Sequence, residues 1–170
     1  RFPETIKSEL PAAISEEDAN VLFDAVSNAI EALMQFREKE GRKLYEFFTK
    51  KIDNIRELLT AVEPYEKERV NKIRARIMDN LSKLDGVAFD KNRLEQEMIF
   101  YIEKLDVNEE KQRLAQHLNY FMETMESGSG QGKKLGFISQ EMGREINTLG
   151  SKSNHAEMQK IVVKMKDELE

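Results

Sequence analysis

The sequence contains no cysteine and no tryptophan, and only three of its 170 residues are proline. Without cysteine, a disulfide framework, a thiolate metal site and a cysteine nucleophile are all excluded. No apolar run approaches the roughly 20 residues that a membrane-spanning helix needs, and the chain does not open with a secretory signal pattern. We therefore expect a soluble, cytoplasmic protein with no membrane partner.

Neither acidic nor basic residues are in strong excess. The 32 acidic and 27 basic residues give a net charge of −5. This balance argues against a protein that coats nucleic acid through overall positive charge, although it leaves room for a local basic site. The chain opens with Arg1 rather than methionine, which suggests a fragment or a processed product.

The positions of the prolines predict an all-α fold. They are Pro3, Pro11 and Pro64, so two long stretches lack proline and are rich in glutamate, lysine, leucine, methionine and alanine. Such composition is typical of helix. Residues 1–15, with two prolines, are instead expected to be an extended lead-in or the remnant of a missing N-terminal domain.

Residues 16–86 predict a long antiparallel helical hairpin. Ser15, followed by three acidic residues, is a good helix start. Apolar residues then recur at 3-and-4 spacing as far as Val62, which predicts a helix of about 47 residues, roughly 70 Å long. Pro64 suits the first turn of a second helix that ends at Asp85-Gly86. The basic residues of this second helix, Arg69 among them, are expected on a solvated face.

Residues 87–170 predict a bundle of about four shorter helices. One is expected over about 91–105 and another after a capping box at Asp106 and Glu109. A flexible glycine-rich loop over 126–132 precedes a helix over about 133–149, with Gly150 as its C′ residue. A capping pattern at Asn154 and Glu157 opens the last helix.

The apolar stripe of the first helix is interrupted near its middle. Continued from Leu33, the spacing reaches Arg37 and Glu40, just before Gly41. A glycine within a helix costs about 1 kcal/mol relative to alanine. Two interpretations remain open: a solvent-facing interval, or a buried ion pair at a close helix contact or a functional site.

Two other polar groupings are candidate sites. Glu110, Arg113 and His117 share one helical face through their i, i+3, i+7 spacing, and Glu97 lies on a similar face of the preceding helix. On the helix over 133–149, two adjacent rows mix amides, hydroxyls and both charges, as hydrogen-bonding sites do. The rows are Gln140, Arg144, Asn147 and Ser151, and Glu141, Glu145, Thr148 and Lys152.

The same segments resemble one known family. They are Arg37-Glu-Lys-Glu-Gly41, Arg93-Leu-Glu-Gln-Glu97, Asn108-Glu-Glu-Lys-Gln-Arg-Leu-Ala-Gln-His117 and Gly132-Lys-Lys-Leu-Gly-Phe-Ile-Ser-Gln-Glu-Met-Gly-Arg-Glu-Ile-Asn-Thr-Leu-Gly-Ser-Lys152. Through them the chain is similar to the YicC/YloC family of bacterial proteins, known as stress-induced proteins and as endoribonucleases. The resemblance covers about residues 23–170 and lacks the family's N-terminal domain.

The resemblance implies a metal-dependent endoribonuclease that works as a ring-like homo-oligomer, a hexamer, and closes on RNA. The expected ion is Mn²⁺, with Mg²⁺ as the alternative. Carboxylates suit such an ion, and cations suit the charge that develops on phosphate. By this chemistry, the candidate metal ligands are Glu97, Glu110, Glu141 and Glu145, and the candidate catalytic groups are Glu141, Glu145, His117 and Arg144. The candidate RNA contacts are Arg113, Lys133, Lys134, Asn147, Ser151 and Lys152.

Two rival functions stay open. The chain could be a non-catalytic helical scaffold in which charges such as Arg37 and Glu40 form buried ion networks that set the geometry of an oligomer. Alternatively, the chain could clamp RNA while the catalytic groups lie in the absent N-terminal domain. Carboxylates that converge on an open, basic-rimmed groove would favour catalysis, whereas ion networks closed on themselves would favour a scaffold or clamp.

Overall fold

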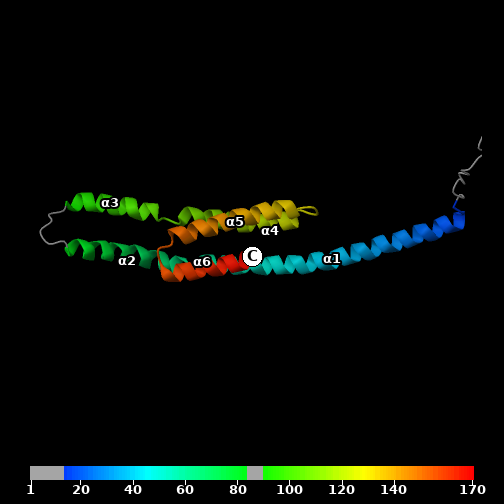
Figure 1. Cartoon of the computed structure of the whole chain (residues 1–170), viewed down its shortest axis with the longest axis horizontal. Helices are drawn as coiled ribbons and strands as arrows, with labels where there is room; N and C mark the ends of the chain where they lie inside the picture. Colours follow the sequence, from blue (N-terminus) through cyan, green and yellow to red (C-terminus); the bar gives the residue numbers. More distant parts are fainter. Residues whose placement is uncertain (1–13, 84–89) are drawn as a thin grey trace, which may run out of the picture. The chain divides into compact units, whose positions relative to one another are not determined.

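A computed structural model of the chain describes residues 14–83 and 90–170, and every regular element within them is an α-helix (Figure 1). The predicted all-α fold class is confirmed. Residues 1–13 of the predicted lead-in and the predicted helix end at Asp85-Gly86 lie outside the described residues. The helices are α1 (Glu16–Thr60), α2 (Glu63–Ser82), α3 (Lys91–Lys104), α4 (Asn108–Glu126), α5 (Gly132–Lys152) and α6 (Ala156–Leu169). None of these six helices has the length and apolar character that a bilayer crossing requires.

The first helix begins where the sequence predicts. The backbone N–H of Asp18 donates to Ser15 Oγ at 3.1 Å, and this hydroxyl donates to Asp18 Oδ2 at 2.6 Å. The serine thus satisfies one of the free N–H groups at the helix start. Acidic residues in the first turn add a favourable interaction with the helix dipole.

The chain divides into two units, one ending at Leu44 and the other running from Tyr45 to Glu170. In the first unit, none of the described side chains of α1 is buried. Its apolar residues are more than half exposed, including Phe23, Val26, Ile30 and Leu33. The first unit therefore has an apolar stripe but no core of its own.

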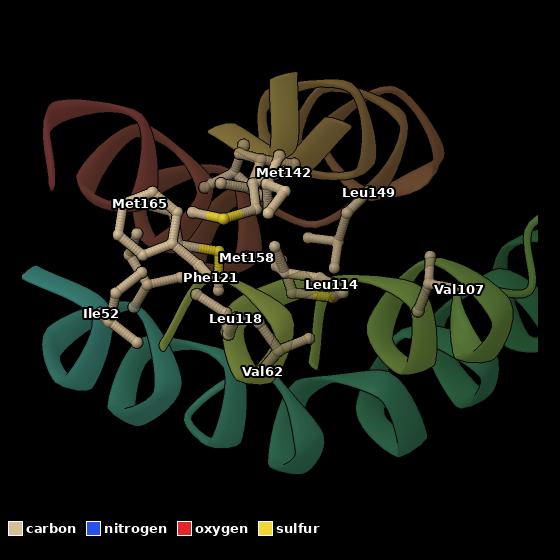
Figure 2. Close-up of a cluster of buried hydrophobic side chains, with 14 residues drawn as sticks. Ile52, Val62, Val107, Leu114, Leu118, Phe121, Met142, Leu149, Met158 and Met165 are labelled. Atoms are coloured by element: carbon tan, nitrogen blue, oxygen red, sulfur yellow. The ribbon is translucent and has the colours of Figure 1, made fainter. Parts of the chain in front are cut away.

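The second unit contains the hydrophobic core, which gathers side chains from the end of α1 and from α4, α5 and α6 (Figure 2). Within it, α5 packs closely against both α4 and α6. Burial of these side chains is the main favourable term for the unit, at about 1.5–3 kcal/mol for each large aliphatic residue. The core consists of Ile52, Ile55, Val62, Val107, Leu114, Leu118, Phe121, Ile138, Met142, Ile146, Leu149, Met158, Val162 and Met165.

The predicted hairpin requires the chain to reverse its direction between α1 and α2, but the chain does not reverse there. Val62 keeps right-handed helical dihedrals (φ −72°, ψ −33°), and its carbonyl accepts from the N–H of Tyr65 at 3.1 Å. The N–H of Ala61 likewise bonds to the carbonyl of Glu57 at 3.0 Å. In the second unit, α2 therefore leads on from the end of α1 (Figure 1). Pro64 occupies the first turn, where its missing N–H removes no helical bond.

The loop between α4 and α5 depends on two glycines. Gly128 (φ +114°) and Gly130 (φ +82°) adopt left-handed backbone conformations that other residues rarely take. They let the chain turn within a few residues, so that α5 returns along α4 (Figure 1).

Three predicted helix ends differ in detail. Gly150 is not a C′ residue but lies inside α5, which continues to Lys152. A Cβ at Gly150 would lie 3.0 Å from Val162 Cγ1, so glycine is needed there for the close approach of α6. The N-cap of α4 is Val107 rather than Asp106, and that of α6 is His155 rather than Asn154. Neither Val107 nor His155 makes a side-chain capping bond. Asp106 Oδ1 nevertheless accepts from the backbone N–H of Asn108 at 3.4 Å, so the carboxylate predicted for the start of α4 does bond to its first turn. The predicted cap of α6 at Asn154 is wrong.

Candidate functional site

The two polar rows of α5 have different environments. The row Lys133, Phe137, Gln140, Arg144, Asn147 and Ser151 is exposed along its whole length, and we call it the exposed row. The row Glu141, Glu145, Thr148 and Lys152 is partly or fully buried, and we call it the inner row. The single broad face expected from the sequence is thus two surfaces.

The inner row meets the start of α4 through opposite charges. Lys152 Nζ lies 2.7 Å from Glu110 Oε1, and the carboxylate of Glu110 is almost fully buried. Two turns earlier on α5, Glu145 Oε1 lies 3.9 Å from an Arg113 nitrogen. Arg113 also pairs with Glu109 on its own helix. The structure therefore brings together four residues that the sequence predicted for the site: Glu110, Arg113, Glu145 and Lys152.

Arg69 joins this cluster from α2. Its guanidinium donates to the carbonyl of Leu105 at 2.8 Å and to that of Lys152 at 3.0 Å, at the C-terminal ends of α3 and α5. Cations are favoured there because the last carbonyls of a helix lack partners and carry partial negative charge. Burial lowers the pKa of Arg69, while the nearby carboxylates of Glu66 and Asp106 oppose that shift. The prediction that Arg69 lies on a solvated face is wrong, because this side chain is 4% exposed.

A further pair ties α2 to α4. Lys111 Nζ lies 2.9 Å from Glu66 Oε1, and both side chains are mostly buried. With it, seven charged residues join α2, α4 and α5, and we call them the polar junction. Its members are Glu66, Arg69, Glu110, Lys111, Arg113, Glu145 and Lys152.

His155 lies beside α2, in the turn that leads into α6. Its ring centroid is 5.4 Å from that of Tyr65, and its Nε2 lies 3.7 Å from Glu68 Oε2 and 3.4 Å from Lys72 Nζ. A hydrogen bond from Lys72 lowers the pKa of Glu68, and the charge of His155 contributes less. This histidine, which the sequence did not single out, thus packs between an aromatic ring and an ion pair.

Other predicted site residues stay apart from the polar junction. Glu141 pairs with Arg144 at 3.3 Å on the surface of α5. Lys134 lies 4.5 Å from the ring centroid of Tyr120, and Lys133 lies 6.0 Å from that of Phe137. The remaining predicted residues are exposed or half-buried: Glu97, His117, Asn147, and Ser151, whose hydroxyl donates to the carbonyl of Thr148.

The four carboxylates predicted as metal ligands do not converge within one chain. Glu110, Glu145 and Glu141 each have a cation as partner, and Glu97 is exposed on α3. Over residues 14–83 and 90–170, no three histidine, aspartate or glutamate side chains are grouped as ligands for an ion. Because a divalent ion needs several oxygen ligands at once, these residues do not fit a metal centre in a single chain.

The interrupted segment of α1 belongs to the first unit. Arg37 is exposed, and Glu40 pairs with Lys43 at 2.9 Å. In the described chain no ion pair links Arg37 to Glu40. Gly41 is also exposed, and a Cβ there would meet no atom within 4 Å.

The sequence did carry a signal for Arg69. Val62, Arg69 and Ile73 lie at i, i+7 and i+11, and all three are buried. Arg69 therefore occupies the apolar stripe of α2 rather than its solvated face. A charged residue on such a stripe indicates either a paired internal cation or a contact surface.

Comparison with known proteins shows similarity to one family. The family model described as "Endoribonuclease YicC-like, C-terminal" matches residues 62–170. The "Probable endoribonuclease YicC" of Clostridioides difficile (strain 630) is 34% identical, over all of this chain and 59% of that protein. The protein of the same name from Haemophilus influenzae is 30% identical, over 98% of this chain and 57% of its own length. The chain thus spans somewhat over half the length of these relatives.

Proposed function

Because the chain belongs to the endoribonuclease YicC-like family, we propose that the whole protein cleaves RNA internally and that this helical region binds the RNA. We further propose that the protein acts as a homo-oligomer that closes around its substrate. The chemistry is assigned to the whole protein because this chain spans 59% and 57% of the two relatives.

The exposed row of α5 is the observation that carries the RNA-binding role. It presents a lysine, an arginine, two amides, a hydroxyl and a phenylalanine along one solvent-facing stripe. Cations and small polar groups contact phosphate and ribose, and an exposed aromatic ring can stack on an unpaired base. Local charge also favours RNA, since residues 133–152 contain four basic and two acidic side chains in an acidic protein.

The polar junction supports a structural role for the inner row. Glu110 and Glu145 lie against cations and are nearly inaccessible to a substrate. A carboxylate held in this way positions helices, and it is not placed to reach a phosphodiester. We therefore favour the clamp, in which the catalytic groups lie in the part of the relatives that this chain does not span, over a complete catalytic centre on α5.

Dependence on Mn²⁺, with Mg²⁺ as the alternative, is part of this proposal for the whole protein. Such an ion supplies positive charge that stabilises the phosphate during cleavage. None of the described carboxylates is assigned to it, because they do not gather around a common point.

The test is an RNA assay on the 170-residue chain, with labelled structured and single-stranded RNA in the presence of Mn²⁺, Mg²⁺ or chelator. The clamp predicts RNA binding without cleavage, and a Glu141→Gln variant should bind as well as the parent. Cleavage that needs the metal and is abolished in Glu141→Gln would place the chemistry on α5 instead. A folded chain that neither binds nor cleaves RNA would overturn the RNA-binding role.

A further inference from the structure

An apolar seam lies uncovered along α1 in the first unit. Phe23, Val26, Ile30 and Leu33 follow alternating 3- and 4-residue steps and are 51–76% exposed. This spacing averages about 3.5 residues and is the repeat of a helix that packs against another helix. An exposed apolar stripe of this length indicates a partner.

The same repeat continues through two charged residues, Arg37 and Glu40, which we call the charged layer. The next positions are Arg37, Glu40 and Leu44, and the leucine is again about half exposed. Within the described residues Arg37 has no ion-pair partner. The pair of Glu40 with Lys43 is solvent-exposed, and such surface pairs contribute little stability. A single polar layer within an apolar seam is a known means of fixing the register and orientation of paired helices.

We propose that α1 pairs with α1 of a second copy in an antiparallel arrangement, about a two-fold axis between Glu38 and Lys39. In a two-fold interface, if residue i meets residue j of the other copy, then j also meets i. This axis sets Arg37 of each copy opposite Glu40 of the other, so that the pair occurs twice. It also sets Leu33 opposite Leu44. The inference rests on the proposed self-association, and it does not depend on RNA cleavage.

The distribution of charge along α1 favours this partner and this orientation. Residues 16–35 contain five acidic side chains and no basic one, whereas residues 42–60 contain five basic side chains together with Glu46, Asp53 and Glu57. An antiparallel pair places the acidic half of one helix beside the basic half of the other. A parallel pair would place the acidic halves together and Arg37 against Arg37, so like charges oppose it.

Gly41 is a second sign of a close helix contact. It lies inside α1, where glycine costs about 1 kcal/mol relative to alanine, and its own chain leaves open space around it. Beside the charged layer, the missing side chain lets the backbone of a second helix approach closely. The charged layer, the glycine and the nearest part of the seam, where Ile30 would meet the exposed Phe47 and Leu33 would meet Leu44, are thus explained by one contact.

Charge exchange tests the pairing directly. In sedimentation equilibrium the parent chain should dimerise, and Arg37→Glu and Glu40→Arg should each weaken the dimer by at least about tenfold, because each sets like charges opposite one another. An equal mixture of the two variants should recover dimers, because the mixed dimer restores opposite charges at both crossings. The introduced glutamate of one chain meets the introduced arginine of the other, and the retained Glu40 meets the retained Arg37. The double variant Arg37→Glu/Glu40→Arg exchanges both charges and keeps every pair opposite in sign, so it should dimerise better than either single variant. If it does not, the proposal is overturned.

Cysteine cross-linking tests the register, and the parent chain has no cysteine to interfere. An equal mixture of Leu33→Cys and Leu44→Cys chains should form a disulfide on oxidation, whereas either variant alone should not. In the proposed register, two copies of residue 33 lie about 16 Å apart along the helix, too far for a disulfide.

The outcomes separate this proposal from the broader one. A disulfide in Leu33→Cys alone would indicate a parallel pair and overturn the antiparallel arrangement. An oligomer that does not cross-link in the mixture would overturn the α1 pairing while leaving self-association intact. A parent chain that stays monomeric at about 100 μM would overturn the α1 pairing and any self-association of this helical region, and neither experiment bears on RNA cleavage.

Discussion

Lys152, the last residue of α5, lies 2.7 Å from the buried carboxylate of Glu110 in the first turn of α4. Each charge also complements its own helix, because anions are favoured at a helix N-terminus and cations at a C-terminus. The backbone carbonyl of Lys152 accepts a bond from Arg69, so one residue fastens α5 to both α4 and α2. This arrangement explains why the polar residues of the inner row are drawn inward.

Removing Lys152 should therefore destabilise the chain. In Lys152→Met, Glu110 keeps its charge but loses its partner, and its Oε2 is already buried without a hydrogen bond from the described residues. We expect a loss of about 1–3 kcal/mol in the free energy of unfolding, less than for a fully buried pair because Lys152 is 30% exposed. Urea unfolding measures it.

The matched variant is the double change Glu110→Gln/Lys152→Met. It removes both charges, so it should be more stable than Lys152→Met alone. Equal losses in the single and double variants would show that the ammonium does not compensate the buried carboxylate.

Arg69 should be less tolerant of substitution than any exposed cation of α2. Arg69→Lys keeps the charge but cannot reach two carbonyls with one rigid fork, so we expect a loss of about 1–2 kcal/mol. Arg69→Met should lose more, because the carbonyls of Leu105 and Lys152 then lack this partner. Thermal unfolding checks both variants, with the exposed Arg74→Met as control. A control that loses as much as Arg69→Met would contradict the assigned role.

The sequence predicted those features that depend on local periodicity. Helix type and the Ser15 cap follow from residue spacing, and the structure confirms both. The continuation from α1 into α2 could not be predicted, because Pro64 is compatible both with a new helix after a reversal and with a bent continuation. Likewise, the separation of the two α5 rows depends on which row α4 covers, and spacing along one helix does not contain that information.

Alanine substitutions at two glycines of α5 should change the free energy of unfolding in opposite directions. At Gly150 the new Cβ would lie 3.0 Å from Val162 Cγ1, so Gly150→Ala should destabilise the contact between α5 and α6 by about 1–3 kcal/mol. At Gly136 nothing lies within 4 Å, so Gly136→Ala should stabilise by up to about 1 kcal/mol through helix propensity. Urea unfolding distinguishes them. Val162→Ala in the Gly150→Ala background should restore part of the stability, and no restoration would exclude steric contact as the cause.

Stability should also depend on pH through Glu168 on α6. A hydrogen bond from Asn54 and the nearby ammonium of Lys51, 3.2 Å away, lower the pKa of Glu168 below its ordinary value of 4.5. Folding therefore favours the ionised form. The resulting stabilisation is fully present above pH 4.5 and disappears as pH falls through the lowered pKa.

The measurement compares the free energy of unfolding of the parent and of Glu168→Gln across that range. The parent should be the more stable protein at neutral pH, and the difference should shrink on acidification. Because Asn54 and Lys51 both lie on α1, the interaction is broken by unfolding. A difference that stays constant with pH would show that the glutamine acts through packing rather than through charge.

The lysines at the start of α5 predict a measurable electrostatic contribution to RNA binding. Lys133→Gln/Lys134→Gln should weaken binding of single-stranded RNA and lower the slope of log affinity against log salt by roughly 1.4, about 0.7 for each phosphate that is no longer neutralised. Fluorescence anisotropy at several salt concentrations gives both quantities. The control is Lys164→Gln/Lys166→Gln, which removes two exposed lysines from α6 with the same change in net charge. Equal effects of the two double variants would mean that RNA responds to overall charge, and the lysines at the start of α5 would have no special role.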